Sequence, residues 1–484
     1  MPRRRRFQFV LSVGLSWVAV LMVIAVLPVR SAVPHLGYGF NLYSDVQTML
    51  DMGFDWMRAF PGNNLAVYPA PINIMFRFPA TYSDTLNITA FGDDVYATAL
   101  DNKDYIEAYE IGNEVNIDNP DYGWGSVPVN AEDYQKLLCE AYTRIKQADP
   151  TAIVVSAGLA PTGRLEGTWQ DANGHIHNGH NGRYQDDREY LKELFNAGGG
   201  ACLDAVGYHS YGFLADYDVA PDVVNQVTSA FEDPRACPNG FCFRGAEKIY
   251  EIMQQQGLGD KKVWATEFGW ITRPPAECLS DPTWGGRAWQ IVSDEKQAEN
   301  LVGAFQYADA HWPWMGTMFM FNLDFVQNPD LPPCEQIRYY SIKGKPAETA
   351  LKAMPKNKAS LTGKLNVDNT ALSILIVSDT QPLTWTPGLN LGNAGWQSLQ
   401  YTVTVDLGAS VAPLVANPIG TLSATAQLPL SLSVPVLSRT VGIYTGTLAI
   451  DWYAAGAGNK PRSVALTMIV VTDVLRVYLP SIVR

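Results

Sequence analysis

Two segments of the sequence place a glutamate where an apolar, strand-like run ends. One reads Tyr109-Glu-Ile-Gly-Asn-Glu-Val-Asn116, and the other reads Val263-Trp-Ala-Thr-Glu-Phe-Gly-Trp270. Their strand-end carboxylates are Glu114 and Glu267. Either glutamate alone is compatible with an ordinary strand-end ion pair, but as a pair they are the candidate catalytic residues.

A pair of carboxyl groups is what cleavage of a glycosidic bond requires. One is protonated and assists the leaving oxygen, and the other is ionised and attacks the anomeric carbon. Burial near a second negative charge favours the protonated form, so the surroundings can give two glutamates different roles. We assign Glu114 as general acid/base and Glu267 as nucleophile. We predict carboxyls about 5 Å apart, which means retention, and not the roughly 8 Å of an inverting enzyme.

Eight β-type runs alternate with amphipathic helical stretches over residues 33–354, which predicts parallel strands joined by crossover helices. The runs are 35–43, 55–60, 72–78, 106–116, 152–159, 203–211, 262–270 and 315–325, and the clearest helices are 131–147, 294–310 and 345–354. Residues 60–72 leave room for little more than a loop. We therefore predict an α/β fold, a (β/α)8 TIM barrel whose fourth and seventh strands end at the face where such barrels build active sites.

The sequence changes character after Met354. Residues 355–360 form a polar linker, and residues 361–475 show period-two alternation punctuated by Pro and Gly, which predicts a small all-β sandwich followed by a tail, 476–484. The stretch Gly442-Ile-Tyr-Thr-Gly-Thr-Leu448 resembles Ig-like and BACON-type modules of bacterial extracellular enzymes.

The N-terminus has the pattern of an export signal. Four arginines, Arg3 to Arg6, precede an uncharged apolar stretch from Phe7 to Val29. We interpret residues 1–32 as a signal peptide, or as a signal anchor that tethers the protein to a membrane and faces it outward. Loss of these residues removes five arginines and changes the formal charge from -13 to -18. Nucleic acid is therefore excluded as a partner, and an extracellular location is predicted.

The six cysteines indicate structural disulfides in an oxidising compartment. Cys237 and Cys242 are close enough for a local clasp, whereas the pairing of the other four stays open. No two cysteines have the C-x2-C spacing of a zinc site. The three histidines in residues 171–180 are interpreted as loop polarity, so neither a metal nor a cofactor is predicted.

Asn113-Glu114 and Thr266-Glu267-Phe-Gly resemble the hallmark of clan A glycoside hydrolases, with families 5 and 39 most similar. The resemblance covers about residues 33–354 and is specific at clan level. It implies a retaining TIM-barrel glycosidase. The eighth strand departs from the pattern, because Phe319, Phe321 and Asn322 stand where relatives often carry tryptophan.

The resemblance also implies roles for supporting residues. Asn113 would bind the sugar 2-hydroxyl, and His209 and Tyr211 match the His-x-Tyr element in which the tyrosine keeps the nucleophile ionised. Arg58 ends the second strand, where relatives place an arginine under the nucleophile, although a surface position is the competing interpretation.

Two further strand-end residues, Asn41 and Trp270, are predicted to reach the pocket. Together these features predict a monomeric, secreted hydrolase of a β-linked oligo- or polysaccharide that acts by double displacement. The alternatives are a transglycosylase with the same residues and a non-catalytic carbohydrate-binding surface protein.

Overall fold

The computed structural model divides the chain into two compact units, Met1–Ala32 and Val33–Arg484. It describes residues 34–471 except for 66–67, 69–71, 104, 151, 222–232, 360–362, 364, 368–370, 378–382, 386–388, 394, 396–397, 408–413, 416–417, 424–425, 435–440 and 454–461. The predicted leader, residues 1–32, and the predicted tail, 476–484, lie outside the described residues. None of the described helices has the length and hydropathy that crossing a lipid bilayer requires.

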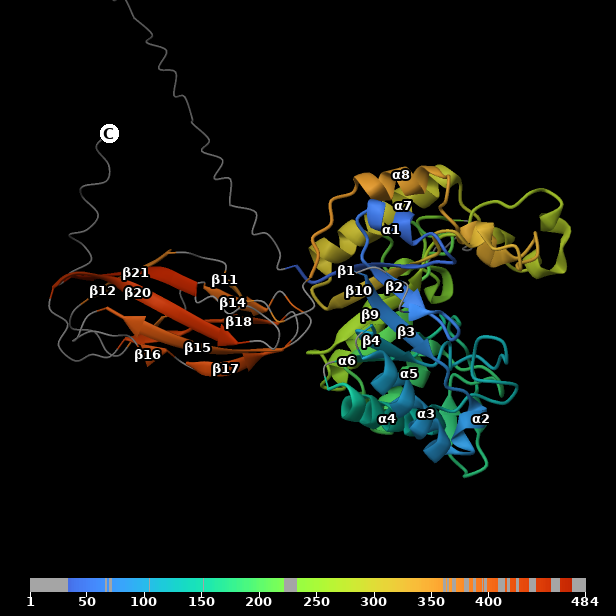
Figure 1. Ribbon diagram of the computed structural model, residues 1–484, viewed down its shortest axis with the longest axis horizontal. Coiled ribbons are helices and arrows are strands. Elements are labelled where there is room, and N and C mark those ends of the chain that lie inside the picture. The colour runs from blue at the N-terminus through green and yellow to red at the C-terminus, as the bar shows by residue number, and fades with distance from the viewer. Residues whose placement is uncertain are drawn as a thin grey trace, which may run out of the picture. The chain divides into compact units, whose positions relative to one another are not determined.

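Eight parallel strands close into a barrel (Figure 1). They are β1 (Gly37–Asn41), β2 (Trp56–Ala59), β3 (Asn73–Phe78), β4 (Ala108–Ile111), β5 (Ile153–Ser156), β8 (Ala205–His209), β9 (Lys262–Phe268) and β10 (Met315–Phe321). Neighbours in the barrel follow chain order, and β1 pairs with β10 to close it. Every strand lies within its predicted run, so the TIM-barrel prediction is confirmed.

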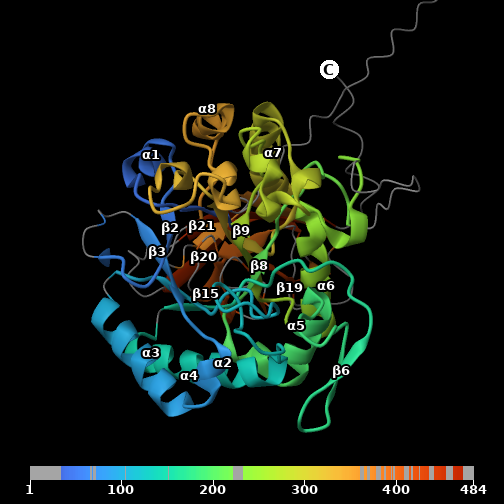
Figure 2. The ribbon, with the colours of Figure 1, turned by 90° about the vertical axis from the view of Figure 1, so that its right-hand side faces the viewer.

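Helices surround these strands (Figure 2). They are α1 (Val46–Asp51), α2 (Tyr82–Thr85), α3 (Ile88–Asn102), α4 (Ala131–Ala148), α5 (Asp187–Asn196), α6 (Ala246–Gln255), α7 (Asp294–His311) and α8 (Pro346–Ala353). Short 3-10 turns are Gly199–Cys202, Pro238–Gly240, Phe243–Gly245, Cys278–Ser280, Pro282–Trp284, Ala288–Gln290, Phe325–Gln327 and Gln336–Tyr340. The three predicted helices are α4, α7 and α8. No α-helix lies in the described residues between β2 and β3, as the short spacing predicts.

Helix α4 shows how sequence pattern positions the site. Asn130 caps its N-terminus by accepting from the Glu132 and Asp133 amides, and an apolar face, including Tyr134, packs on the barrel. The Tyr134 hydroxyl donates to the Ile111 carbonyl at 2.7 Å and accepts from the amide of residue 157 at 2.7 Å. The ends of β4 and β5 are thereby held at a fixed separation.

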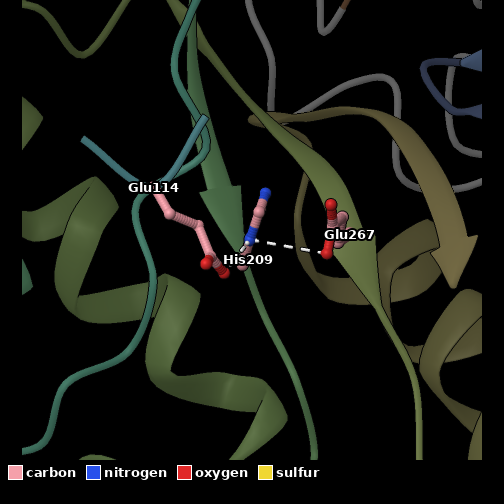
Figure 3. A group of neighbouring side chains, drawn as sticks. All are labelled: Glu114, His209 and Glu267. Atoms are coloured by element: carbon pink, nitrogen blue, oxygen red, sulfur yellow. Dashed lines mark hydrogen bonds and ion pairs between the residues drawn. The ribbon is translucent and has the colours of Figure 1, made fainter. Parts of the chain in front are cut away.

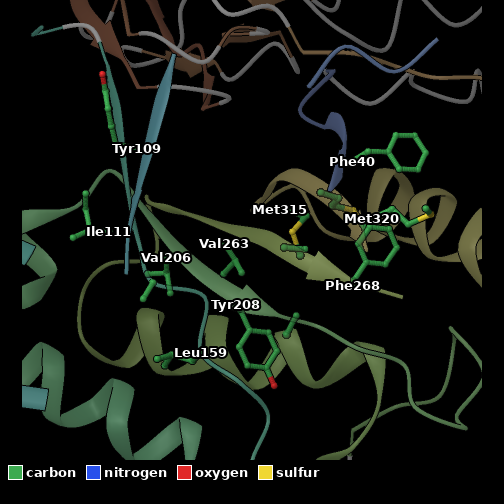
Figure 4. Packing of buried hydrophobic residues seen from close by; sticks show 14 of the residues in the cluster. Phe40, Tyr109, Ile111, Leu159, Val206, Tyr208, Val263, Phe268, Met315 and Met320 are labelled. Atoms are coloured by element: carbon green, nitrogen blue, oxygen red, sulfur yellow. The ribbon is translucent and has the colours of Figure 1, made fainter. Parts of the chain in front are cut away.

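Apolar side chains fill the interior of the barrel and the space between its strands and the surrounding helices. One buried cluster takes a residue from each of seven strands: Trp56, Met75, Ala108, Val155, Ala205, Trp264 and Phe319. Side chains from seven strands can meet only inside the barrel, so this cluster is an interior plug beneath the carboxyl-terminal ends of the strands. On the outside, residues such as Tyr208 and Phe268 belong to the main core (Figure 4). Phe319, noted at the tryptophan position, thus lies in the plug.

All six cysteines form disulfides: Cys139–Cys202, Cys237–Cys242 and Cys278–Cys334. The first joins α4 to the turn before β8, and the third joins the loops that follow β9 and β10. The prediction of structural disulfides, including the short clasp, is confirmed.

The region after the barrel is β-rich. Its strands are β11 (Leu365–Val367), β12 (Ala371–Val377), β13 (Leu383–Trp385), β14 (Asn390–Asn393), β15 (Leu399–Asp406), β16 (Leu414–Val415), β17 (Ile419–Leu422), β18 (Gln427–Pro429), β19 (Leu432–Val434), β20 (Gly442–Tyr453) and β21 (Arg462–Val471). They form sheets β11-β14-β18, β12-β21-β20-β15-β17 and β13-β19-β16. Leu372, Leu391 and Leu432, one from each sheet, share one hydrophobic cluster. A second, all-β region is confirmed, while its boundaries and its Ig-like kinship remain predictions.

Candidate active site

The loop after β4 presents Glu114 in an unusual backbone conformation. Gly112 has φ 84° and turns the chain at the strand end, and Glu114 itself has φ 42°, in the left-handed region that side chains other than glycine rarely adopt. Its amide donates to the Gly158 carbonyl at 2.9 Å. A strained residue held in place by its surroundings is typical of functional sites.

Glu267 reaches the barrel interior because β9 carries one extra residue. Tyr208 pairs with Ala265 but His209 pairs with Glu267, and β10 shows a matching register shift. Simple alternation would place Trp264 and Glu267 on opposite faces. The insertion lets Trp264 fill the plug while Glu267 also points inward.

His209 lies between the two carboxylates (Figure 3). Its Nδ1 is 2.9 Å from Glu114 Oε1 and 3.6 Å from Glu267 Oε2, and the ring is fully buried. Burial and the charge of Arg58 lower the pKa of His209, but the charges of Glu267 and Glu114 and the hydrogen bond to Glu114 outweigh them. The net effect raises the pKa, which favours the imidazolium.

Both oxygens of Glu267 are engaged. Oε1 accepts from Arg58 Nη1, and Oε2 accepts from the Tyr211 hydroxyl at 2.6 Å. Burial acts to raise the pKa of Glu267, but the positive charges of His209 and Arg58 and the two hydrogen bonds hold it below its usual value. Glu267 is therefore ionised in its resting state.

Arg58 organises the floor of the site. It is 1% exposed, and its Nε donates to Glu110 Oε2 at 2.6 Å. Nη1 donates to Asn41 Oδ1 at 3.2 Å as well as to Glu267, and Nη2 donates to Asn113 Oδ1 at 2.7 Å. A guanidinium held by four neighbours fixes the Glu267 carboxylate in one orientation.

Glu110 is absent from the predicted site, yet it is fully buried beside Arg58. Its Oε1 accepts from the Gly158 amide at 3.1 Å, which links Arg58 to the end of β5. The sequence holds one signal for it, a charged residue in the middle of a strand of otherwise apolar residues. Its partner is 52 positions away and cannot be read from the sequence.

The predicted site residues divide into two groups. The structure brings together Asn41, Arg58, Asn113, Glu114, His209, Tyr211 and Glu267. Trp270 is not among them: its Nε1 donates to the Ala215 carbonyl at 2.8 Å, and its buried ring packs against Phe243, 5.9 Å away. Trp270 lies two residues beyond the end of β9 and is a packing residue.

Aromatic residues surround Tyr211. The ring centroids of Phe321 and Tyr340 lie 6.0 and 5.3 Å from that of Tyr211, and the Phe321–Asn322 peptide is cis.

Two further tyrosines near the site are not among the predicted residues. The carbonyl oxygen of Tyr122 accepts a hydrogen bond from Asn113 Nδ2 at 2.6 Å. Burial raises the pKa of the Tyr340 hydroxyl to about 12 against an opposing effect of Arg287. Tyr122 and Tyr340 come from loops, whose conformations no sequence periodicity indicates.

Two parts of the structure contain histidines near carboxylates and could in principle bind a metal: the site around His209 and the loop of residues 171–180. Among the described residues, one set of side chains, Glu114, His209 and Glu267, offers donor atoms within 4.8 Å of one another. The Glu267 oxygens and His209 Nδ1 already have partners, and the guanidinium of Arg58 beside them opposes a further cation. This arrangement favours a reaction carried out by the two carboxyl groups themselves over one that uses a bound metal ion.

Two short strands, β6 (Thr168–Gln170) and β7 (Ile176–Asn178), form a hairpin in this part of the chain. Each of the three histidines in residues 171–180 has its own partner. His177 Nδ1 lies 2.6 Å from Glu193 Oε2, and the Trp169 ring stacks on His180 with centroids 4.7 Å apart. The polar side chains of this loop therefore hold it in place against the neighbouring residues.

No protein-family model and no curated protein sequence matches the chain. Among solved structures, β-glucuronidase 2 of Bacteroides uniformis, covalently bound to cyclophellitol-6-carboxylate aziridine, is similar with a TM-score of 0.41 and 12% identity over 90% of this chain and 46% of that one. The endo-β-1,4-mannanase of Thermotoga petrophila has a TM-score of 0.33 and 13% identity over 91% and 98% of the two chains. This chain thus spans less than half the length of the first. Such low scores carry no argument about activity, which rests on the site itself.

Proposed function

We propose that this protein is a retaining glycoside hydrolase. The observation that carries the proposal is the placement of two glutamates on either side of His209. One carboxylate oxygen of Glu114 and one of Glu267 lie within 4.8 Å of each other. Carboxyls about 5 Å apart support double displacement, since a water between them would need roughly 6.5–9.5 Å.

The nucleophilic role belongs to Glu267, because its surroundings favour the ionised form. Arg58 and Tyr211 each donate to one of its oxygens, and both contacts also fix the direction of attack. Attack on the anomeric carbon forms a glycosyl-enzyme ester and breaks the bond to the leaving oxygen.

Glu114 then has the acid/base role. His209 contacts Oε1, which leaves Oε2 to carry the proton that the leaving oxygen receives. Esterification removes the charge of Glu267, so the ionised Glu114 can next accept a proton from water as it attacks the ester. The proposed substrate is a β-linked oligo- or polysaccharide outside the cytoplasm.

The acid/base assignment is tested with Glu114→Gln and aryl glycosides whose leaving groups differ in basicity. We expect kcat/KM to fall by roughly 10²–10⁴ for poor leaving groups, which need protonation, and far less for dinitrophenyl glycosides. Added azide should restore turnover and give a glycosyl azide of retained configuration. Glu251→Gln, an exposed change on α6, is the matched control. An equal loss for every leaving group, without azide rescue, would refute the role of Glu114.

A further inference from the structure

Arg77 occupies the inner face of the barrel at the level of the catalytic floor. In the β3–β4 register it pairs with Glu110, which points inward to Arg58. Two residues earlier on β3, Met75 lies in the interior plug. Side chains two apart on a strand share a face, so Arg77 points inward one layer closer to the catalytic face.

The guanidinium of Arg77 is unpaired. Its Cζ lies 4.9 Å from the centroid of the Phe60 ring, which the Arg58 Cζ also approaches at 5.7 Å. No hydrogen-bond acceptor or carboxylate within the described part of the chain pairs with Arg77, whereas Arg58 has four such partners. Arg77 is also only partly exposed. The Arg77 nitrogens are not among the buried polar atoms that lack a partner, so they reach solvent and can donate to an acceptor on a ligand.

The net charge of the site is positive while Glu114 is protonated. Glu110 and Glu267 are negative, and Arg58 and the His209 imidazolium balance them when Glu114 holds the proton it must donate. Glu110, Glu267 and Glu114 attract Arg77, but none of them forms an ion pair with it. Burial and the charge of Arg58 lower the pKa of Arg77 and outweigh the opposing effect of these three carboxylates.

We propose that the sugar bound at this site carries an oxyanion that pairs with Arg77. This inference rests on the proposed glycosidase function and adds the class of substrate to it. Five N–H donors in a planar fork match the oxygens of a carboxylate or sulfate and are more than one hydroxyl group can satisfy. Uronosyl residues and sulfate esters share this chemistry.

The test compares wild-type kcat/KM for matched aryl β-glycosides: neutral hexosides, the corresponding uronides and the 6-sulfates. We expect one anionic series to exceed its neutral partner by about ten- to a hundredfold, the effect of charge-assisted hydrogen bonds. Which series it is identifies the carboxylate or the sulfate as the source. Arg77→Gln should reduce the ratio of anionic to neutral kcat/KM to about one, and Arg77→Lys should keep part of the preference. Arg144→Gln on the outer helix α4 should leave the ratio at its wild-type value.

The possible failures are distinguishable. Turnover of neutral glycosides equal to or above that of both anionic series would overturn the inference and leave the glycosidase proposal standing. If no glycoside is turned over, the glycosidase proposal fails, and an array of neutral and acidic oligosaccharides probed with wild type and Arg77→Gln decides about the anion site. Binding of acidic glycans that is lost in Arg77→Gln supports that site, and equal or absent binding of both proteins contradicts it.

Discussion

The charge of Glu267 depends on three neighbours that come from two strands, β2 and β8. Arg58 lies in β2, His209 is the last residue of β8, and Tyr211 lies two residues after His209. Burial alone would favour the neutral acid, so each neighbour contributes to keeping Glu267, the proposed nucleophile, ionised. Tyr211 is the one that can be changed with the least alteration of charge or volume.

Tyr211→Phe removes the hydroxyl that donates to Glu267 Oε2 at 2.6 Å and keeps the ring. Hydrogen bonds to a charged group contribute about 1.5–3 kcal/mol, so we expect kcat/KM to fall about ten- to a hundredfold. Because this bond lowers the pKa of Glu267, its loss raises that pKa, and the acidic limb of the pH–kcat/KM profile moves to higher pH. Tyr250→Phe, on α6, is the control. An acidic limb that stays in place would contradict the role of Tyr211.

The elements of the barrel could be predicted, whereas two local features of the site could not. Period-two runs and amphipathic stretches locate all eight strands because burial imposes those patterns on the sequence. The inserted residue in β9 leaves no trace in the pattern, and neither does the pairing of Glu110 with Arg58. The apolar run predicts a strand that continues to Trp270, whereas β9 ends at Phe268 and Trp270 packs against Phe243.

Gly158, just after β5, makes room for His209. A Cβ at this position would lie 2.3 Å from His209 Cδ2 and Nε2 and 2.3 Å from Thr266 Oγ1, so a side chain must displace the imidazole or the strand. Misplacement by about 1 Å can reduce a rate roughly 10²-fold, and we expect a loss of this order in kcat/KM for Gly158→Ala. Steady-state kinetics with an aryl glycoside measures it.

The control for that change is Gly259→Ala, just before β9 and therefore at the opposite end of the barrel. Its Cβ would lie 3.3 Å from the flexible Gln254 side chain, and the next atoms, Gln254 Cα and the Tyr250 hydroxyl, would be at 3.7 and 3.8 Å, which is ordinary van der Waals contact. If Gly158→Ala keeps wild-type kcat/KM, the close fit of His209 between the glutamates is not required for activity.

At the scale of the whole molecule, disulfides join parts of the barrel that are distant in sequence. Cys139–Cys202 spans 63 positions and Cys278–Cys334 spans 56, whereas Cys237–Cys242 spans 5. A cross-link stabilises the fold by restricting the unfolded chain, and the effect grows with the length of the loop that it closes. The even number of cysteines predicts such bonds, but their pairing requires the fold.

Removal of the long bridge should therefore cost more than removal of the short one. We expect the Cys139→Ala/Cys202→Ala double variant to lose roughly 4 kcal/mol in free energy of unfolding and Cys237→Ala/Cys242→Ala to lose about 2 kcal/mol. Guanidinium denaturation of the barrel, followed by tryptophan fluorescence, gives both values. A larger loss for the short bridge would mean that local packing, and not loop closure, sets the stability.

The central claim, that Glu267 forms a covalent bond with the sugar, is tested most directly by intact-protein mass spectrometry. The protein is exposed to 2-deoxy-2-fluoro glycosides, neutral and anionic, whose glycosyl-enzyme esters hydrolyse slowly, and the labelled peptide is then sequenced. We predict an added mass of one fluorosugar on Glu267 in the wild type and none in Glu267→Gln. A label on another residue, or efficient turnover of the parent glycoside with inverted configuration and no adduct, would contradict the account.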